Sequence, residues 1–261
     1  MKVFTEYLKN NFKRALEYKT DFFMGLIGLI TINFSSIIIL VLIANNFTTI
    51  GEWTIWEVIF NYSLFLAGLG LHKMFFRNVV ELERHIIKGT FDRFLLRPFS
   101  PFFQLVFEKL SLLDNTDFLL GIIGLTVSIL NLEIKWGIWQ SIGIFIAVLN
   151  SALVFTLILT IITTMSFWIY RIRAILYGTS ELQEAVQNYP ITIYNKPLKF
   201  ILTYILPYAA TNFYPALILL GKEEDKIGQV FLYLILLDII LICAEIVLWK
   251  KGVKSYQSSG S

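Results

Sequence analysis

Long stretches without charged side chains alternate with short polar connections along this chain. Between Phe22 and Gly51 there is no charged residue, and Trp136 to Tyr170 is equally free of charge. An apolar run of about 20 residues is long enough to cross the hydrocarbon layer of a membrane as a helix. The pattern predicts five clear spans, at residues 22–44, 56–76, 111–130, 141–168 and 227–249. Trp53 and Trp56 are interpreted as interfacial anchors of the second span.

The distribution of lysine and arginine predicts the orientation of these spans. The first 20 residues contain five, the connection from Leu71 to Lys109 contains seven, and the C-terminal tail contains three. The connection from Asn45 to Trp56 contains none. Because basic connections stay in the cytoplasm, both chain ends are expected there, which requires an even number of crossings. The expected architecture is therefore all-α, with six transmembrane helices in one membrane domain over residues 1–261.

The sixth crossing is hidden between residues 172 and 220, and two placements compete. In the first, residues 172–189 cross, and residues 190–220 form a broken or re-entrant outer segment. In the second, residues 198–220 cross. Hydropathy favours the second placement, because the first puts several acidic and amide side chains in the bilayer. The backbone favours the first, because the second puts Pro207 and Pro215 inside a spanning helix.

Two amphipathic segments accompany the spans. Residues 1–20 carry apolar side chains at helical spacing between lysines, which predicts an interfacial helix on the anionic inner surface of the membrane. Residues 90–97 predict a short helix capped by Thr90 and ended by Pro98. Its apolar side would carry Phe91, Phe94 and Leu95, and its charged side Asp92, Arg93 and Arg97. Such a segment either docks into a partner or, without one, is merely a loop at the membrane interface.

Acidic side chains inside apolar segments are functional candidates by default. Glu181, Glu184 and Gln187 would share one side of a helix, facing a wet pathway, a subunit interface or solvent. Asp238 and Glu245 are seven residues apart on the last span and so share a helix face. We expect them to face a protein interface and to pair with an arginine or lysine of another span.

Composition agrees with a membrane protein and excludes several classes of function. Hydrophobic residues make up 56% of the chain and charged residues 16%, against about 45–50% and about 25% in soluble domains. A net charge of +3 gives no reason to expect nucleic-acid binding. The chain has no G-x-x-x-x-G-K-[ST], H-E-x-x-H or G-x-S-x-G motif, and His72 and His85 are interpreted as isolated surface histidines. The lone Cys243 is interpreted as a packing residue.

Several local sequences resemble a known family. They are G-T-F-D-R-F-L-L-R-P-F-S-P at 89–101, Y-P-I-T-I-Y at 189–194, the Pro207 and Pro215 turns, and the ending K-S-Y-Q-S-S-G-S. These resemble the membrane subunits of type-two ATP-binding-cassette exporters, in the branch related to daunorubicin-resistance permeases. The resemblance covers nearly the whole chain, although residues 179–188 are more polar than that pattern.

The resemblance implies a permease subunit of the bacterial plasma membrane that has no catalytic residues, metal site or cofactor of its own. It implies a second permease copy or paralogue and two separate cassette ATPases, which hold the ATP and Mg. Residues 90–97 become a coupling helix, with ATPase-contacting residues Thr90, Phe91, Asp92, Arg93, Phe94, Leu96, Arg97 and Pro98. It also favours a crossing before Pro190, with a pathway formed by Glu181, Glu184, Gln187, Tyr189, Pro190 and Asn212.

Two other functions remain open from the sequence. One is a non-transporting membrane scaffold or sensor subunit that uses the same loop for assembly. The other is a membrane-embedded enzyme acting on lipids, with Glu181, Glu184, Asp238 and Glu245 as acid–base groups. The transported substrate does not follow from the residues.

Overall fold

The computed structural model describes residues 24, 27, 28, 31, 49, 50, 52–109, 116–132, 134, 136–169, 171–222 and 224–257. The predicted interfacial helix at 1–20 lies outside these residues. The predicted span 22–44 also lies outside them, except for four of its positions.

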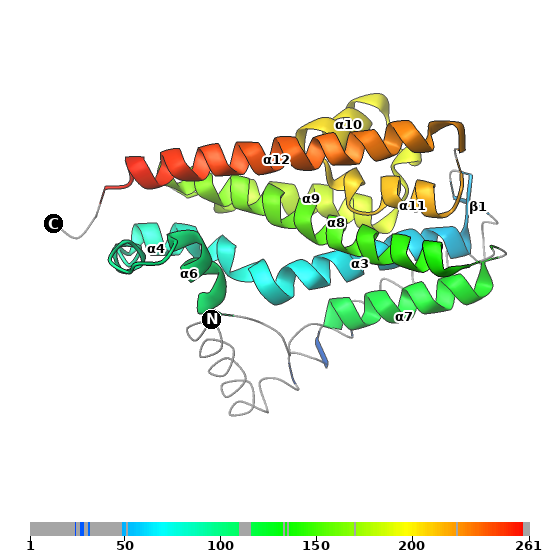
Figure 1. The fold of residues 1–261 in the computed structure, drawn as a ribbon, viewed down its shortest axis with the longest axis horizontal. Helices are drawn as coiled ribbons and strands as arrows, with labels where there is room; N and C mark the ends of the chain where they lie inside the picture. The colour runs from blue at the N-terminus through cyan, green and yellow to red at the C-terminus, as the bar shows by residue number, and fades with distance from the viewer. Residues whose placement is uncertain are drawn as a thin grey trace.

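Four long helices lie side by side in the described part of the chain (Figure 1). They are α7 (Thr116–Asn131), α3 (Ile55–Phe76), α8 (Ile138–Thr164) and α12 (Ile227–Ser255). Helix α3 packs between α7 and α8, and α8 packs against α12. With a rise of 1.5 Å per residue, α8 and α12 are about 40 Å long, enough to cross a bilayer.

The described residues contain three helices that are long and apolar enough to cross a membrane. These are Ile55–Ile87, Ile138–Phe167 and Ile227–Ser255. Helix α7 is apolar but shorter, and it covers most of the predicted span 111–130. The prediction of a helical membrane protein is therefore confirmed, whereas the number of six crossings stays a prediction.

Small residues let α3 and α7 approach closely. A Cβ atom added to Gly70 would overlap the backbone of Phe118, and one added to Gly121 would overlap the backbone of Ala67. A Cβ atom on Gly124 would overlap the Ser63 side chain. Such small-residue contacts are the usual way for helices to pack inside a membrane, where no hydrophobic effect draws them together.

One end of the bundle, which we call the C-terminal end, consists of short helices packed on the last turns of α12. The chain leaves α3 through the 3₁₀ segment η1 (Arg77–Glu81) and α4 (Leu82–Ile87). Gly89, with a φ of 65°, then reverses the chain into α5 (Asp92–Leu95). Helix α6 (Pro101–Glu108) follows, and the 3₁₀ segment η2 (Met165–Phe167) at the end of α8 packs beside α4.

The opposite end, which we call the hairpin end, contains the two-residue strands β1 (Thr49–Ile50) and β2 (Trp53–Thr54). They pair antiparallel, with Thr49 opposite Thr54. Trp53 is only 2% exposed, so the prediction of an interfacial anchor is wrong for this residue. Its ring packs on Phe213 at 5.4 Å and lies under the Lys222 ammonium group at 5.2 Å, which explains its burial.

Residues 173–226 form a helix followed by a broken segment. Helix α9 (Arg173–Asn188) ends just before Pro190, as expected from the restriction that proline places on the preceding residue. The chain continues through these short elements: η3 (Ile191–Ile193), α10 (Lys196–Phe200), the π-helical η4 (Ile201–Ile205), η5 (Tyr208–Ala210), α11 (Phe213–Leu219) and η6 (Glu224–Lys226). Residues 198–220 therefore do not form one continuous helix, which counts against the second placement. A membrane crossing by α9 stays a prediction.

Candidate coupling site and pathway helix

The predicted helix at residues 90–97 is shorter in the structure, where α5 covers only Asp92–Leu95. Thr90 does not cap it. The Thr90 hydroxyl lies 2.9 Å from Nδ1 of His85 and donates to the His85 carbonyl oxygen at 3.4 Å. The Phe91 amide also donates to that carbonyl oxygen, at 3.1 Å. The backbone before α5 is thus fixed by α4, which leaves Thr90 outside the helix.

One side of α5 is buried in a cluster of aromatic rings. Phe91 is fully buried and Phe94 is 2% exposed. They pack against Leu82 of α4 and Leu105 of α6. Further partners are Phe167 of η2, Trp249 and Val253 of α12, and Tyr256 just after α12. Phe91 and Phe94 therefore anchor α5 to the bundle, and neither ring is available to a partner.

Gln104 of α6 holds the end of this segment. Its Nε2 donates to the Phe94 carbonyl oxygen at 2.9 Å and to the Phe99 carbonyl oxygen at 2.6 Å. The Gln104 side chain is 2% exposed. Because carbonyl groups at a helix C-terminus lack partners within the helix, this amide supplies a bond that the short α5 cannot make itself.

A charged network joins α4, α5 and α6. Glu108 forms an ion pair with Arg93, and its Oε2 lies 3.1 Å from Nε2 of His85. Partial burial raises the pKa of the Glu108 carboxyl, but the bonds and charge of His85 and Arg93 outweigh burial and lower the pKa below its ordinary value. His85 is 4% exposed and His72 3%, so the interpretation of both as surface histidines is wrong. His72 is buried against Thr156, with Nδ1 2.9 Å from its hydroxyl oxygen.

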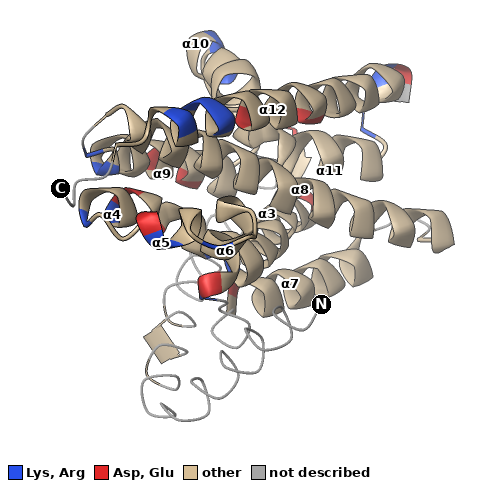
Figure 2. Ribbon diagram, turned by 60° about the vertical axis from the view of Figure 1, so that its left-hand side comes forward, with Lys and Arg blue, Asp and Glu red and all other residues tan. Residues whose placement is uncertain are grey.

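The other side of α5 projects away from the bundle. Leu96 is 85% exposed and Leu95 is 42% exposed, whereas the sequence placed Leu95 on the same side as Phe91. Arg93, Arg97, Pro98 and Phe99 are also exposed, and Asp92 is half-buried. Charged residues of both signs gather at this end of the bundle, whereas the middle of the long helices carries few (Figure 2).

The predicted polar stripe lies on the open side of α9. Glu181 and Glu184 are exposed, and Gln187 is half-buried. Thr179 and Val186, which are buried, mark the opposite side of the helix. The structure thus brings three of the six predicted pathway residues to one face.

Asn212 does not belong to this face. It is fully buried at the start of α11, where its Nδ2 donates to the Val186 carbonyl oxygen at 3.0 Å and to the Asn61 carbonyl oxygen at 3.4 Å. These bonds tie α11 to the last turn of α9 and to α3. Tyr189 is half-buried and Pro190 buried at the end of α9.

The two acids of the last span, the buried Glu245 and the half-buried Asp238, have no basic partner among the described residues. Oε1 of Glu245 accepts from the Thr164 hydroxyl at 3.4 Å, and Oε2 lacks a hydrogen bond within the described residues. Oδ1 of Asp238 likewise lacks a hydrogen bond within the described residues. The expected arginine or lysine partner is therefore not found in the part of the chain that the structure describes.

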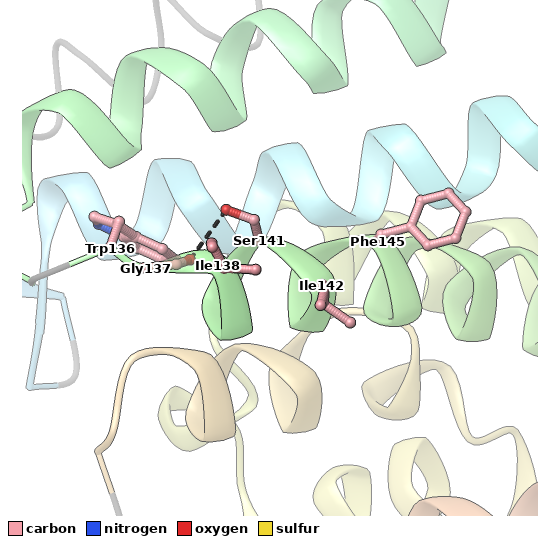
Figure 3. Close-up of a pocket in the computed structure, with 6 residues that line it drawn as sticks. All are labelled: Trp136, Gly137, Ile138, Ser141, Ile142 and Phe145. Atoms are coloured by element: carbon pink, nitrogen blue, oxygen red, sulfur yellow. Dashed lines mark hydrogen bonds between the residues drawn. The ribbon is translucent and has the colours of Figure 1, made fainter.

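A pocket beside the start of α8 contributes no further chemistry. Its lining consists of Trp136, Gly137, Ile138, Ser141, Ile142 and Phe145 (Figure 3). The Ser141 hydroxyl donates to the Gly137 carbonyl oxygen at 3.2 Å, and none of the six side chains is charged.

Sequence reasoning missed Gln104, Glu108 and the ring cluster on α12. No local signal identified Gln104 or Glu108, because their partners lie on other short helices. Trp249 and Tyr256 did carry a signal, since two aromatic residues flank the basic C-terminal tail, but the sequence does not show that Phe91 packs between them.

Comparison with known proteins identifies the family. A family model described as an ABC-2 family transporter protein matches residues 30–260. No curated protein and no solved structure matches the chain significantly. The match spans α3 to α12 and includes both the α5 segment and the polar face of α9. The chain therefore belongs to the ABC-2 family of transporter proteins.

Proposed function

We propose that this chain forms one half of the translocation pathway of an exporter and pairs with a second permease copy or paralogue. Two separate cassette ATPases, which bind ATP and Mg, drive it. Family membership supports the role as a membrane subunit with cassette partners, because ABC-2 proteins are membrane components of ATP-binding-cassette transporters and associate with such partners. The proposal places the chain in the bacterial plasma membrane, with the C-terminal end of the bundle in the cytoplasm.

The observation that carries the proposal is the two-sided character of α5. Its inner side is fixed by the rings of Phe91 and Phe94 and by the amide of Gln104. Its outer side presents Leu96, 85% exposed, next to Arg97. An exposed leucine on a rigid base is suited to fill a pocket of a partner, since interface energy concentrates in a few anchors on ordered surfaces. We assign this outer side, with Asp92, Arg93 and Pro98, to contact with the ATPase.

The polar face of α9 supports a water-lined pathway. Charged side chains within a membrane face a bundle interior or a wet cavity, because transfer of a charge into lipid is costly. Glu181 and Glu184 are exposed in the single chain and so require water or a second subunit beside them. In this proposal Gln187, Tyr189 and Pro190 continue the pathway, and Asn212 holds the end of α9 in place from behind.

The proposed mechanism follows from these placements. ATP binding closes the two ATPases and moves the α5 segments seated in them. The movement shifts each helical bundle between inward-open and outward-open or collapsed states, and hydrolysis resets the system.

Replacement of Leu96 by glutamate tests the docking role. We expect the amount of cassette ATPase that co-purifies with the full chain to fall by about tenfold or more, because a charge would enter the anchor position. Arg97→Glu should weaken the complex less. Lys196→Glu is the matched control, since Lys196 is an exposed cation on α10 at a distance from α5. Wild-type recovery of the ATPase with Leu96→Glu would contradict the docking role.

A further inference from the structure

We infer that the last turns of α12 and the residue after it, Tyr256, transmit displacements of α5 to the membrane helices, with Trp249 and Tyr256 acting as positioning residues through Phe91. This inference rests on the proposed docking role of α5. It assigns a function to a C-terminal segment that otherwise looks like a simple basic tail.

The ring of Phe91 lies at the centre of the contact. Its centroid is 5.0 Å from that of Tyr256, 5.3 Å from that of Phe167 and 6.5 Å from that of Trp249. The interplanar angles of 70–76° describe edge-to-face packing, which is the favourable geometry for aromatic pairs. One residue at the start of α5 thus contacts both the end of α12 and the end of α8.

The partners of Phe91 are themselves in close contact. Phe167 lies 5.9 Å from Trp249 and 6.2 Å from Tyr256, measured between ring centroids. A Cβ atom on Gly252 would overlap the Phe167 ring, so α12 and η2 meet without space between them. Phe102 of α6 completes the cluster, with its ring 5.2 Å from that of Trp249.

The cluster also leads toward the polar face of α9. Phe167 belongs to η2, which precedes the short turn into α9. Arg173, the first residue of α9, forms an ion pair with Glu83 of α4, with Nε of Arg173 3.7 Å from Oε2 of Glu83. Because packed cores transmit displacement instead of absorbing it, a shift of α5 displaces the ends of α12 and α8 and, through them, the start of α9.

Substitution of Tyr256 tests the inference in the full chain. Tyr256→Ala removes the ring nearest to Phe91, and Tyr256→Phe keeps it. We expect hydrogen exchange of the α5 amides in detergent to become about tenfold faster with alanine and to stay near wild type with phenylalanine. Phe231→Ala is the control, because this α12 aromatic is 56% exposed and distant from the cluster.

A second measurement addresses coupling. The complex that co-purifies with its cassette ATPase is reconstituted into vesicles of phosphatidylethanolamine and phosphatidylglycerol. We expect Tyr256→Ala to retain a wild-type amount of bound ATPase but to lose most of the difference in ATP turnover between the complex and the free ATPase. Tyr256→Phe should restore that difference.

The outcomes separate the inference from the proposed function. Unchanged α5 exchange, or unchanged turnover in the complex, with Tyr256→Ala would overturn the role of α12. Loss of bound ATPase with Tyr256→Ala would also overturn it, because the residue would then support docking and not transmission. Failure of Leu96→Glu to reduce ATPase binding would instead contradict the docking role of α5 itself.

Discussion

The two ends of the bundle are both irregular, but different kinds of contact predominate in them. At the C-terminal end, aromatic rings from α5, α6, η2 and α12 pack around Phe91, and one side of α5 stays exposed. At the hairpin end, polar side chains such as Asn212 and Lys222 bind backbone carbonyl groups of distant elements. Close-packed rings pass a displacement from one element to the next, whereas the hydrogen bonds of Asn212 hold α11 to α9 and α3 in one geometry. We therefore expect the C-terminal end to respond as a linked group and the hairpin end to keep its arrangement.

Phe91→Ala, at the C-terminal end, should cause the largest loss of stability. The substitution leaves a cavity among four elements, and truncation of a buried phenylalanine costs about 3–5 kcal/mol of stability. Thermal unfolding of the purified chain in detergent, followed by tryptophan fluorescence, measures the loss. An effect no larger than that of the exposed Phe231→Ala would show that the rings do not hold this end together.

Asn212→Ala should have the next largest effect, at the hairpin end. It leaves the buried carbonyl groups of Val186 and Asn61 without this donor, at a cost of about 1–3 kcal/mol. We expect proteolysis to become faster within residues 190–220, where the chain forms only short helical segments. Asn195→Ala is a useful comparison, because Asn195 is exposed and caps only the short α10. Equal effects of the two variants would argue against a fixed hairpin end.

Lys222→Met, also at the hairpin end, should cause a smaller loss of stability. The Lys222 ammonium group lies 2.9 Å from Oε2 of Glu57 and 5.2 Å from the Trp53 ring centroid. Loss of this ion pair and cation–π contact should cost about 1 kcal/mol. The expected readout is a small fall in the unfolding temperature, and Lys196→Met, at an exposed lysine of α10, should change it less.

The smallest expected effect concerns pH at the C-terminal end. Because the folded structure lowers the pKa of Glu108 from 4.5, the ionised carboxylate stabilises the fold above that value. This stabilisation is lost as the pH falls through the lowered pKa. The difference in unfolding temperature between wild type and Glu108→Gln should therefore shrink from about pH 6 to about pH 3. A constant difference over this range would exclude the carboxylate charge as its cause.

The sequence predicts the long helices well and the short ones poorly. Long apolar runs mark α3, α8 and α12, because a helix that crosses the hydrocarbon layer must be predominantly apolar. Pro190 likewise marks the end of α9. By contrast, α5 is shorter than its amphipathic pattern suggests. His85 engages Thr90, and the chain reversal at Gly89 turns Leu95 outward, and neither effect is visible in local spacing.

In the candidate site, too, features set by local periodicity could be predicted, and features set by tertiary contacts could not. The polar stripe on α9 follows from helical periodicity, and the structure places its three members on one side. Asn212 is also one of the predicted pathway residues, but its partners are carbonyl groups 26 and 151 residues away in sequence. The ring cluster at Phe91 likewise joins residues from four elements, and only the tertiary fold brings them together.

The close approach of α3 and α7 limits how the protein can change shape. Gly70 faces the Phe118 backbone, and Gly121 faces the Ala67 backbone, with no room for even a methyl group between them. Sliding one helix along the other would bring a larger residue against each glycine, so this pair is a rigid frame. We therefore expect α3 and α7 to move together, as one body, whenever the protein changes shape.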